Sequence, residues 1–437
     1  MYTIPPIRSF RVPTYNSVDA TILLQREATA SDGGIQRGWS DSDLPDDLLD
    51  TVYLSCFTAY DRARFAAVCA SWRAVPSWHP PLPALPLLLP FTGNGDRDRQ
   101  ARAYSPEDGR ALRVPMPRFA LGSHWQLLGS HDGGWIIPAS KVDSEILIVN
   151  PFSGAQLRLP LPVTDGSTDS RKIIFSDDPT SSGCIAAAII GDCAVGLCRI
   201  DCPELGWVVR ELADYPKGYD DDDLEDILFY NGELYGLKCY NGCKRLLKFD
   251  TALNKDGALK VTFVHRLANI DMSIWCLELG EYYCAGHIFD LHRKLAIAVE
   301  FTSHHNDKET HFVRVFQLVN KAPHRSVWVE VTSLGDCALF VGEMCCRAVH
   351  VSTRRGMVEK NHIYHSKQRR LDDHCKKEGV PGFTRQFLRR LDLGNCHVYH
   401  CEKDDGVHPP SSERITSRGY HHYIDVRDCL WLLPPDF

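Results

Sequence analysis

Cysteine and histidine are abundant in this sequence, and their spacing indicates whether they can bind metal. The chain contains 17 cysteines and 19 histidines. The segment CHVYHC, from Cys396 to Cys401, alternates the two ligand types, but successive side chains of a strand point to opposite faces, so each face would present only two ligands. A structural zinc site takes four ligands, and Cys239 and Cys243 lack the CxxC spacing of such sites. We therefore expect core thiols and surface histidines, with no metal and no cofactor.

The acidic run from Asp220 to Asp223, followed by Glu225 and Asp226, is a second candidate, because carboxylates bind calcium. The run lacks the central Gly and the distal Glu of an EF-hand loop. Adjacent like charges in a loop are usually hydrated. The pattern therefore favours a solvated loop over a calcium site.

A third candidate is the stretch from Lys367 to Arg390, which is rich in Lys and Arg and also contains Phe383 and Phe387. Such a stretch can contact nucleic acid, an acidic partner or a nuclear importer. The sequence favours the alternative, a solvated helix whose apolar residues pack on the rest of its domain. The formal net charge of −7 gives no reason to expect nucleic-acid binding, which calls for a basic footprint.

Common catalytic motifs are absent from the sequence. It contains no GxSxG nucleophile elbow, no Walker loop and no GxGxxG that opens a helix after a strand. Ser, His and Asp are plentiful, but no spacing pairs them as a catalytic triad. A hydrolase or an oxidase would need carboxylates or metal ligands that converge in space. Our expectation is a protein without catalytic residues.

Length and composition predict a small module plus one large domain. The chain has 437 residues, and a hydrophobic content of 44% supports a sizeable core. The cysteines are scattered and odd in number, and neither a secretory signal nor an apolar run long enough to span a membrane is found. These features predict a protein of a reducing compartment, the cytoplasm or the nucleus or both, with no membrane contact.

The first secondary structure predicted along the chain lies between Trp39 and Trp78, where apolar residues recur at helical spacing. Proline is favoured at the first helical position, so a helix is predicted to begin at Pro45. Asp46 and Asp47 then lie in its first turn, where the helix dipole favours negative charge. One apolar stripe at helical spacing is expected to follow, formed by Leu48, Leu49, Val52 and Cys56.

A second helix is expected to open near Asp61 and to end at Pro76. Its apolar side is predicted to consist of Phe65, Val68, Cys69 and Trp72. A unit of about forty residues rarely buries enough apolar surface to be stable alone. It is therefore completed either by another protein or, as a helical lid, by the rest of the chain.

The run LPDDLL, followed after a gap by DRARFAAVCASWRAV and a Trp, resembles the F-box of plant substrate receptors. The resemblance covers nearly the whole helical stretch, with a two-residue departure, Ser42-Asp43, in its lead-in. In that family the box docks onto a Skp-type adaptor, which links the receptor to a cullin and a RING ubiquitin ligase. The resemblance implies that the box and its adaptor face are built by the following residues: Leu44, Pro45, Leu48, Val52, Val68, Cys69 and Trp72.

Beyond a proline-rich segment, the sequence consists of short β-branched and aromatic runs separated by turn residues. Asn231-Gly232, between ILFY and ELYGL, predicts a type I′ hairpin, and Asn241-Gly242 follows. Similar units recur every forty to sixty residues or so, roughly the spacing of propeller blades. The sequence thus predicts a mainly β protein, with two to three N-terminal helices followed by a β-propeller of about six to eight blades.

Segments of this region resemble, in order, the plant KIB-type β-propeller domain of unknown function: NPFSGAQLRLP, DILFYNGELYGL, WVEVTSLGDCALFVGE, NHIYH and WLLPPDF. The resemblance extends from Leu82 to Phe437 and departs from the family at the basic stretch, where the family has a short loop. A propeller is stable only when its first and last blades join. We therefore predict that Tyr423 to Leu433 forms a strand beside Leu85 to Phe91, with Trp431 pointing inward.

These observations divide the chain into four parts, which are a flexible extension (1–38), an F-box (39–79), a proline-rich connector (80–84) and a KIB-type β-propeller (85–437). The two resemblances together imply a substrate-receptor subunit of a Skp-cullin-F-box ubiquitin ligase, a plant protein that performs no catalysis itself. Its expected partners are a Skp-type adaptor, through it a cullin, and an unknown target protein. The alternative is a propeller interaction scaffold whose F-box does not engage an adaptor.

Overall fold

The computed structural model divides the chain into two compact units, Met1–Pro80 and Pro81–Phe437. The residues that the structure describes are 44–56, 59–66, 68–79, 84–92, 101–107, 109–114, 125–140, 145–162, 170–212, 223–240, 243–255, 257, 259–271, 282–305, 308–322, 325–342, 344–351, 358–368, 397–400, 416–422 and 426–435.

The first unit is helical. Among its described residues the elements are α2 (Asp46–Ser55), α3 (Ala59–Ala66), α4 (Ala70–Ala74) and the 3-10 helix η1 (Val75–Trp78). Pro45 has a ψ of 148° and occupies the N-cap, so α2 begins one residue later than predicted. The Pro45 carbonyl accepts hydrogen bonds from the N–H groups of Leu48 and Leu49 at 3.0 and 3.1 Å. Asp46 and Asp47 occupy the first turn, as expected from the helix dipole.

The predicted second helix is in fact two helices. α3 begins two residues before Asp61, which therefore lies in its first turn rather than at its N-cap. The chain leaves the helical conformation before Cys69, whose φ of −161° and ψ of −177° make it the extended N-cap of α4. Phe65 and Trp72 consequently come from different helices, although they were expected on one. The last α-helix ends before Pro76, which lies in η1, in agreement with a stop at that proline.

The second unit consists of strands. In chain order they are β1 (Leu87–Thr92), β2 (Ala101–Tyr104), β3 (Ala111–Val114), β4 (Trp125–His131), β5 (Trp135–Ser140), β6 (Glu145–Val149), β7 (Gln156–Pro160), β8 (Ser170–Phe175), β9 (Ile185–Ile190), β10 (Ala194–Arg199), β11 (Val208–Glu211), β12 (Asp223–Tyr230), β13 (Glu233–Tyr240), β14 (Cys243–Leu253), β15 (Leu259–Asp271), β16 (Tyr282–Asp290), β17 (Leu295–His305), β18 (Lys308–Ala322), β19 (Arg325–Glu330), β20 (Cys337–Val341), β21 (Arg347–His350), β22 (His362–Gln368), β23 (His397–His400), β24 (Thr416–His422) and β25 (Val426–Leu432). A short 3-10 helix, η3 (Pro203–Leu205), joins β10 to β11.

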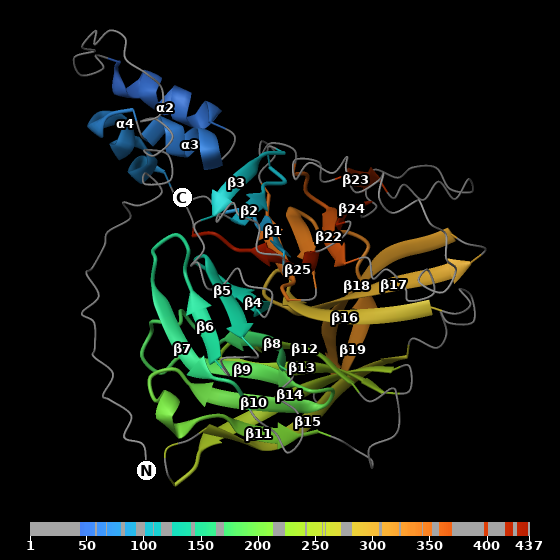
Figure 1. Cartoon of the computed structure of the whole chain (residues 1–437). Coiled ribbons are helices and arrows are strands. Elements are labelled where there is room, and N and C mark those ends of the chain that lie inside the picture. The colour runs from blue at the N-terminus through green and yellow to red at the C-terminus, as the bar shows by residue number, and fades with distance from the viewer. Residues whose placement is uncertain are drawn as a thin grey trace, which may run out of the picture. The chain divides into compact units, whose positions relative to one another are not determined.

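The strands form six sheets, numbered here as blades 1 to 6. Their strand orders are β25-β1-β2-β3, β4-β5-β6-β7, β11-β10-β9-β8, β12-β13-β14-β15, β16-β17-β18-β19 and β21-β20-β22-β24-β23. Figure 1 shows these sheets following one another around a ring. In blade 6, β22 pairs in parallel with both β20 and β24. The mainly β fold class is confirmed, and six blades lie within the predicted range.

Buried apolar side chains join each blade to the next. Each of the six junctions, including the one between blade 6 and blade 1, contains a separate cluster of them. At the junction of blades 6 and 1, Leu88 and Trp431 of blade 1 pack with Phe340 and Tyr364 of blade 6. Because the clusters follow one another around the whole circle, the ring is closed.

The C-terminal strand closes this ring as predicted. β25 pairs antiparallel with β1, and Trp431 lies opposite Leu88. The Trp431 side chain is fully buried, and its Nε1–H donates a hydrogen bond to the Val341 carbonyl at 2.9 Å. The strand lies within the predicted range Tyr423 to Leu433, of which residues 423–425 are outside the described part of the chain. The prediction of a closing strand with an inward Trp431 is confirmed.

The hairpin between β12 and β13 is also confirmed. Asn231 and Gly232 have positive φ angles of 51° and 76°, as a type I′ turn requires. Tyr230 then lies opposite Glu233, so the turn has two residues. The second turn signal, at positions 241 and 242, lies outside the described residues, and the strands on either side of it pair.

The predicted solvated acidic loop is wrong for its last residues. Asp223, Glu225 and Asp226 lie in β12, where the Asp226 side chain is fully buried, that of Glu225 is 12% exposed and that of Asp223 is partly exposed. The Nζ of Lys172 lies 2.5 Å from the Asp226 carboxylate, and Lys244 pairs with Glu225. The two carboxylates can leave solvent because each is compensated by a cation, Asp226 by Lys172 of β8 in the preceding blade and Glu225 by Lys244 of β14 in the same blade. Residues 220–222 lie outside the described part of the chain.

Two other predicted features lie largely outside the described residues. The basic stretch that begins at Lys367 is described only as far as Gln368, the end of β22. Of the segment CHVYHC, the backbone of β23 is described, whereas Cys396 and Cys401 are not. None of the helices among the described residues is long and apolar enough to cross a membrane.

Candidate functional site

Helix α2 presents apolar side chains both to the core of the first unit and to solvent. Leu49 and Tyr53 are only 1% and 5% exposed, whereas Leu48 and Val52 are 47% and 38% exposed. The members of each pair are four residues apart, so they lie one above the other on the helix. Leu48 and Leu49 point about 100° apart. The single stripe predicted from the sequence is therefore two stripes, one buried and one exposed.

The buried stripe belongs to a small core. Leu49 and Tyr53 pack with Phe65 of α3 and Val75 of η1, and Trp72 of α4 packs against this cluster. The ring of Phe65 lies 5.5 Å from that of Tyr53 and 4.5 Å from that of Trp72, measured between centroids. Each helix among the described residues of the unit thus contributes to one cluster of aromatic and aliphatic side chains, which holds α2 in a fixed orientation.

A hydrogen bond supports the same helix from the end of the unit. The Nε2 of His79, just after η1, lies 2.6 Å from the Oδ1 of Asp50 in α2. The His79 ring also stacks on Tyr53, with ring centroids 5.2 Å apart. Both contacts join His79 to α2. They help to fix the position of this helix, and with it that of the exposed side chains of Leu48 and Val52.

The seven residues that the sequence singled out for adaptor binding fall into two groups. Five are exposed, namely Leu44, Pro45, Leu48, Val52 and Val68. Cys69 and Trp72 are partly buried. The Sγ of Cys69 lies 3.0 Å from the Oγ of Ser71, and Trp72 packs on the core. The structure therefore separates five residues available for contact from two that support the fold of the unit.

Two further exposed apolar residues were not singled out from the sequence. Leu54 of α2 and Trp78 of η1 are 57% and 47% exposed. Leu54 follows Leu48 by six positions, which places it about 120° away around the helix. It lies off the exposed stripe of Leu48 and Val52, so helical periodicity gave no signal for it. An exposed tryptophan at the end of a small unit is typical of a contact surface.

The titratable groups near α2 do not favour nucleophilic chemistry. Burial raises the pKa of the Cys56 thiol, and Asp61 adds to the increase. Burial also raises the pKa of Tyr53, against the opposing charge of Arg62. Both groups are therefore neutral near pH 7, and a protonated thiol is a poor nucleophile. The exposed stripe consists of the apolar side chains of Leu48 and Val52, which suit contact with another protein and carry no reactive group.

In the propeller, the most polar buried region joins blades 3, 4 and 5. The carboxylate of Asp226 in β12 accepts hydrogen bonds from the backbone N–H of Ile227 at 2.7 Å and from that of Ile288 in β16 at 2.9 Å. It also pairs with Lys172 of β8. One carboxylate thus connects the inner strands of three successive blades.

Two more ion pairs surround this connection. Burial raises the pKa of Glu225, although the nearby Lys244 acts in the opposite direction. Burial lowers the pKa of His287, but its hydrogen bond to Glu300, at 3.1 Å, and the charge of that carboxylate outweigh this effect and raise the pKa above its ordinary value. Each cation has a carboxylate partner, so the arrangement supports a structural role.

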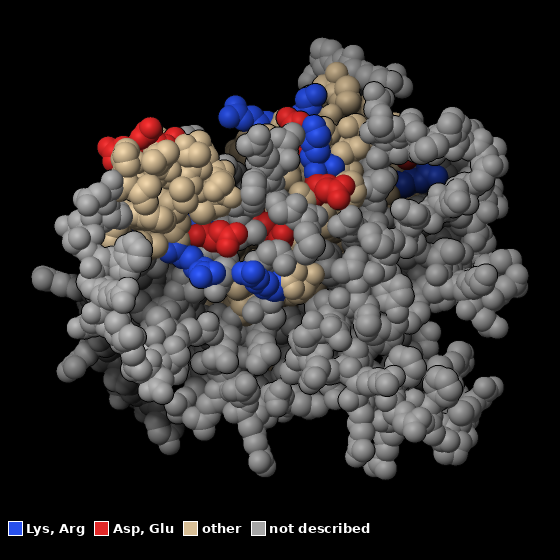
Figure 2. Space-filling view, turned by 90° about the horizontal axis from the view of Figure 1, so that it is seen from above, with Lys and Arg blue, Asp and Glu red and all other residues tan. Residues whose placement is uncertain are grey.

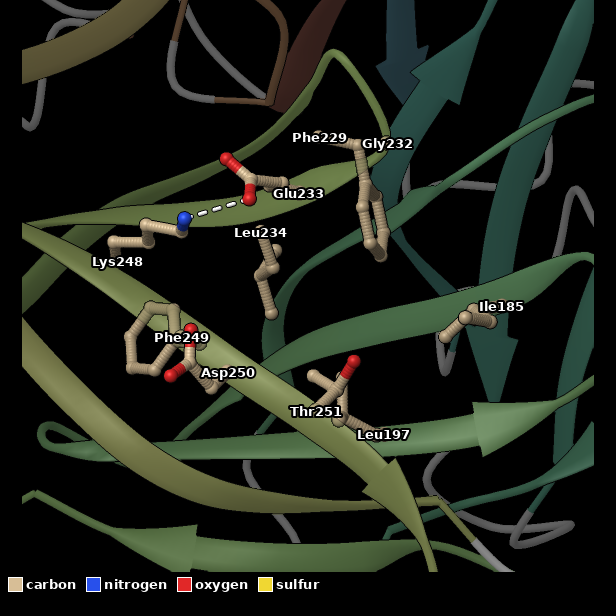
Figure 3. A pocket seen from close by; sticks show the side chains of 10 residues that line it. All are labelled: Ile185, Leu197, Phe229, Gly232, Glu233, Leu234, Lys248, Phe249, Asp250 and Thr251. Atoms are coloured by element: carbon tan, nitrogen blue, oxygen red, sulfur yellow. Dashed lines mark ion pairs between the residues drawn. The ribbon is translucent and has the colours of Figure 1, made fainter.

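A pocket of about 270 Å³ lies between blades 3 and 4 (Figure 3). Leu234 and Phe249 belong to the apolar cluster at this junction, and the ion pair of Glu233 and Lys248, at 2.6 Å, lies beside them. The volume is slightly below the range of about 300–1,000 Å³ typical of sites for whole small molecules. The polar side chains that line the pocket are those of Glu233, Lys248, Asp250 and Thr251.

Charge on the surface is mixed. Figure 2 shows Lys and Arg side chains of the described residues interspersed with Asp and Glu on the face seen from above. Within the described part of the chain, no group of three or more His, Cys, Asp or Glu residues is placed to hold a metal ion.

Comparisons with known proteins concern mainly the propeller. A family model described as the KIB1-4 beta-propeller matches residues 103–400. No curated protein sequence matches the chain. The crystal structure of Saccharomyces cerevisiae Sqt1 shares 13% identity with a TM-score of 0.29, over 58% of this chain and 66% of that one, just under two thirds of its length. A protein from Lactobacillus plantarum shares 9% identity with a TM-score of 0.26, over 50% of this chain and 68% of that one.

Proposed function

This chain belongs to the KIB1-4 beta-propeller family, and from that premise we propose that it is a substrate-receptor subunit of a Skp-cullin-F-box ubiquitin ligase. The helices of the first unit are the F-box, which docks onto a Skp-type adaptor in the cytoplasm or nucleus. The propeller binds the protein to be modified. The transfer of ubiquitin is performed by the subunits attached to the cullin, so this chain is not an enzyme.

The observation that carries the proposal is the exposed stripe of α2. Leu48 and Val52 are exposed on a helix that the unit's own core holds in place. Full burial of a Leu or Val side chain is worth about 1.5–3 kcal/mol, and Leu48 and Val52 are 47% and 38% exposed, so burial of their remaining surface offers about 1–3 kcal/mol to a partner. A micromolar complex needs about 8 kcal/mol in total. Leu44 and Val68, also exposed, add a similar amount, and the remainder has to come from other contacts of the interface.

The propeller supports the second half of the proposal, target binding. Its closed ring and six buried clusters make a rigid body, on which connecting loops can vary without loss of the fold. Binding to a protein needs a stable surface and no catalytic group. Three ion pairs inside the described part of the propeller, Lys172–Asp226, Lys244–Glu225 and His287–Glu300, compensate their charges internally, which fits a binding role.

The test is a substitution on the exposed stripe with a matched control on the same helix. Leu48→Asp places a charge in the proposed interface, whereas Leu54→Asp makes the same change at a similarly exposed position about 120° away. A charge in a desolvated apolar contact costs several kcal/mol. Binding of a purified Skp-type adaptor to the full-length chain is measured by calorimetry, with circular dichroism as the control for folding.

We expect Leu48→Asp to weaken adaptor binding by about 100-fold or more, and Leu54→Asp to change it by less than about threefold. Unchanged binding of Leu48→Asp would show that α2 does not dock the adaptor. An unmodified chain that binds no adaptor would support the scaffold alternative, in which the propeller binds its partner without the ligase.

A further inference from the structure

The outer strands of blades 4 and 5 expose apolar side chains. Phe263 and Leu267 of β15 are 59% and 36% exposed, and Val329 of β19 is 43% exposed. β15 ends its sheet, because the order of blade 4 is β12-β13-β14-β15 and β12 contacts the inner strands β8 and β16. β15 and β19 also contact each other. The exposed residues therefore lie along the rim of the propeller.

β15 is an edge strand with an open middle. It pairs with β14 on one side, and no other strand of the described residues pairs with it. Leu259 and Val261 near its start are buried against blade 3, and Ala268 near its end is buried against blade 5. Between them Thr262, Phe263, Arg266 and Leu267 are exposed. In such a strand, alternate backbone N–H and C=O groups point away from the sheet and are available to an added strand.

Two irregularities limit this open segment. The register between β14 and β15 shifts between Asp250 and Thr251 and again between Leu246 and Leu247. The residues of β15 left over by these shifts are Thr262 and Leu267, so the regular segment between them covers 263–266. Bulges of this kind protect edges from indiscriminate pairing. The remaining edge is long enough for a short added strand and too short for aggregation along a whole rim.

The charges of the strand select the kind of segment that fits. Lys260 and Arg266 are exposed on β15, in a chain whose net charge is −7. His265 pairs with Asp250 at 2.7 Å, and its ring contacts that of Phe263 at 4.5 Å between centroids. An acidic, partly apolar strand is therefore complementary to the edge. A second copy of β15 is not, because like charges would lie across the new pair.

We propose that the open edge of β15 is a target-binding surface that receives an extended, acidic segment of the target protein by β-strand addition. Backbone hydrogen bonds to residues 263–266 hold the segment, Phe263 contacts its apolar side chains, and Lys260 pairs with one of its carboxylates. This inference rests on the proposed function as a receptor and specifies the class of target segment.

The probe is a fluorescein-labelled octapeptide of alternating Glu and Val, titrated with the full-length chain and followed by fluorescence anisotropy. Two variants lie on the edge, Phe263→Ser and Lys260→Glu. Two matched controls make the same kinds of change elsewhere in the propeller, Leu205→Ser in η3 and Lys294→Glu between β16 and β17, both exposed positions. A peptide of alternating Lys and Val tests the charge.

We expect the acidic peptide to bind and each edge variant to weaken it by about tenfold, with changes of less than about twofold in the controls. The Lys peptide should bind at least about tenfold more weakly than the acidic one. Two further peptides, methylated on the backbone nitrogens of odd or of even residues, test strand pairing. At least one of them should lose binding, because only one set of N–H groups faces the edge.

Absence of binding by the acidic peptide, or equal losses in edge and control variants, overturns the proposal. Binding that tolerates both methylation patterns shows simple apolar contact and overturns strand addition. Adaptor binding is measured on the same protein, so the two proposals fail separately. A chain that binds the adaptor but not the peptide refutes only this inference, and one that binds the peptide but no adaptor refutes the receptor function.

Discussion

Replacement of Trp431 by Ala is the most direct test of how the propeller is held closed. This side chain lies on β25, is fully buried and packs on the Phe340 ring in a T-shaped arrangement with 5.0 Å between centroids. Its Nε1–H satisfies the carbonyl of Val341 in blade 6. The residue therefore joins the two blades that are farthest apart in the sequence.

The magnitude follows from these contacts. Truncation of a buried Trp to Ala costs about 3–5 kcal/mol through lost burial and the resulting cavity. The Val341 carbonyl is left without its donor, which costs about 1–3 kcal/mol more. Because the two effects overlap, we expect a loss of about 4–6 kcal/mol, a large part of the roughly 5–15 kcal/mol that stabilises a folded domain. Trp431→Phe keeps most of the ring and removes the donor, so it should cost about 1–3 kcal/mol.

The assay is equilibrium denaturation by urea of the full-length chain, followed by tryptophan fluorescence and by far-ultraviolet circular dichroism. Loss of closure should lower the midpoint of unfolding and also the slope, because a ring opened at blade 1 unfolds less cooperatively. A matched control is Trp78→Ala, at an exposed tryptophan of the first unit. If Trp431→Ala lowered the free energy of unfolding by less than about 1 kcal/mol, β25 would not be the element that closes the ring.

Three further outcomes are expected. Trp72→Ala should unfold the helical unit, since it removes about 3–5 kcal/mol from a core of four buried residues, and proteolysis of residues 44–79 with an intact propeller would report it. Asp226→Asn should lower the free energy of unfolding by about 3–5 kcal/mol, because it leaves the charge of Lys172 uncompensated. The double variant Lys172→Met with Asp226→Leu removes both charges and should lower it by less. An equal loss in the two variants would contradict an ionic role for this pair. The pKa of His287 is raised by Glu300 in the folded chain, so the contribution of the protonated histidine to the free energy of unfolding is complete below the unfolded pKa of about 6.5 and is lost as the pH rises through the folded value. His287→Phe should remove this pH dependence from the free energy of unfolding. An unchanged pH profile in this variant would exclude the histidine as its source.

The features predicted well from the sequence are those set by a local rule or by the topology of a ring. Asn231-Gly232 forms the expected turn because few residues other than Gly and Asn adopt positive φ without strain. The closing strand followed from a physical requirement, since a propeller with an unpaired first strand exposes backbone groups. The apolar content of the strand around Trp431 was sufficient to identify it.

The predictions that failed depended on contacts distant in sequence. Asp226 was expected in a solvated loop because the sequence does not show that Lys172, fifty-four positions earlier, lies beside it. In the helical unit, periodicity grouped Leu48 with Leu49, and only packing against Phe65 and Val75 decided which of them is buried. The break before Cys69 was missed because the residues around it carry no proline or glycine signal.

The pairing of β25 with β1 also imposes an order on biosynthesis. β1 ends at Thr92 and its partner ends at Leu432, so 340 residues are translated between them. At about 5–20 residues per second, β1 waits roughly 17–70 s for the strand that completes its blade. During this time Leu88 and Leu89 lack the cover that β25 gives them, and a chain that terminates early never acquires it. The propeller therefore acquires a covered β1 only after translation has passed β25, and a chain that stops before this strand keeps an exposed apolar edge.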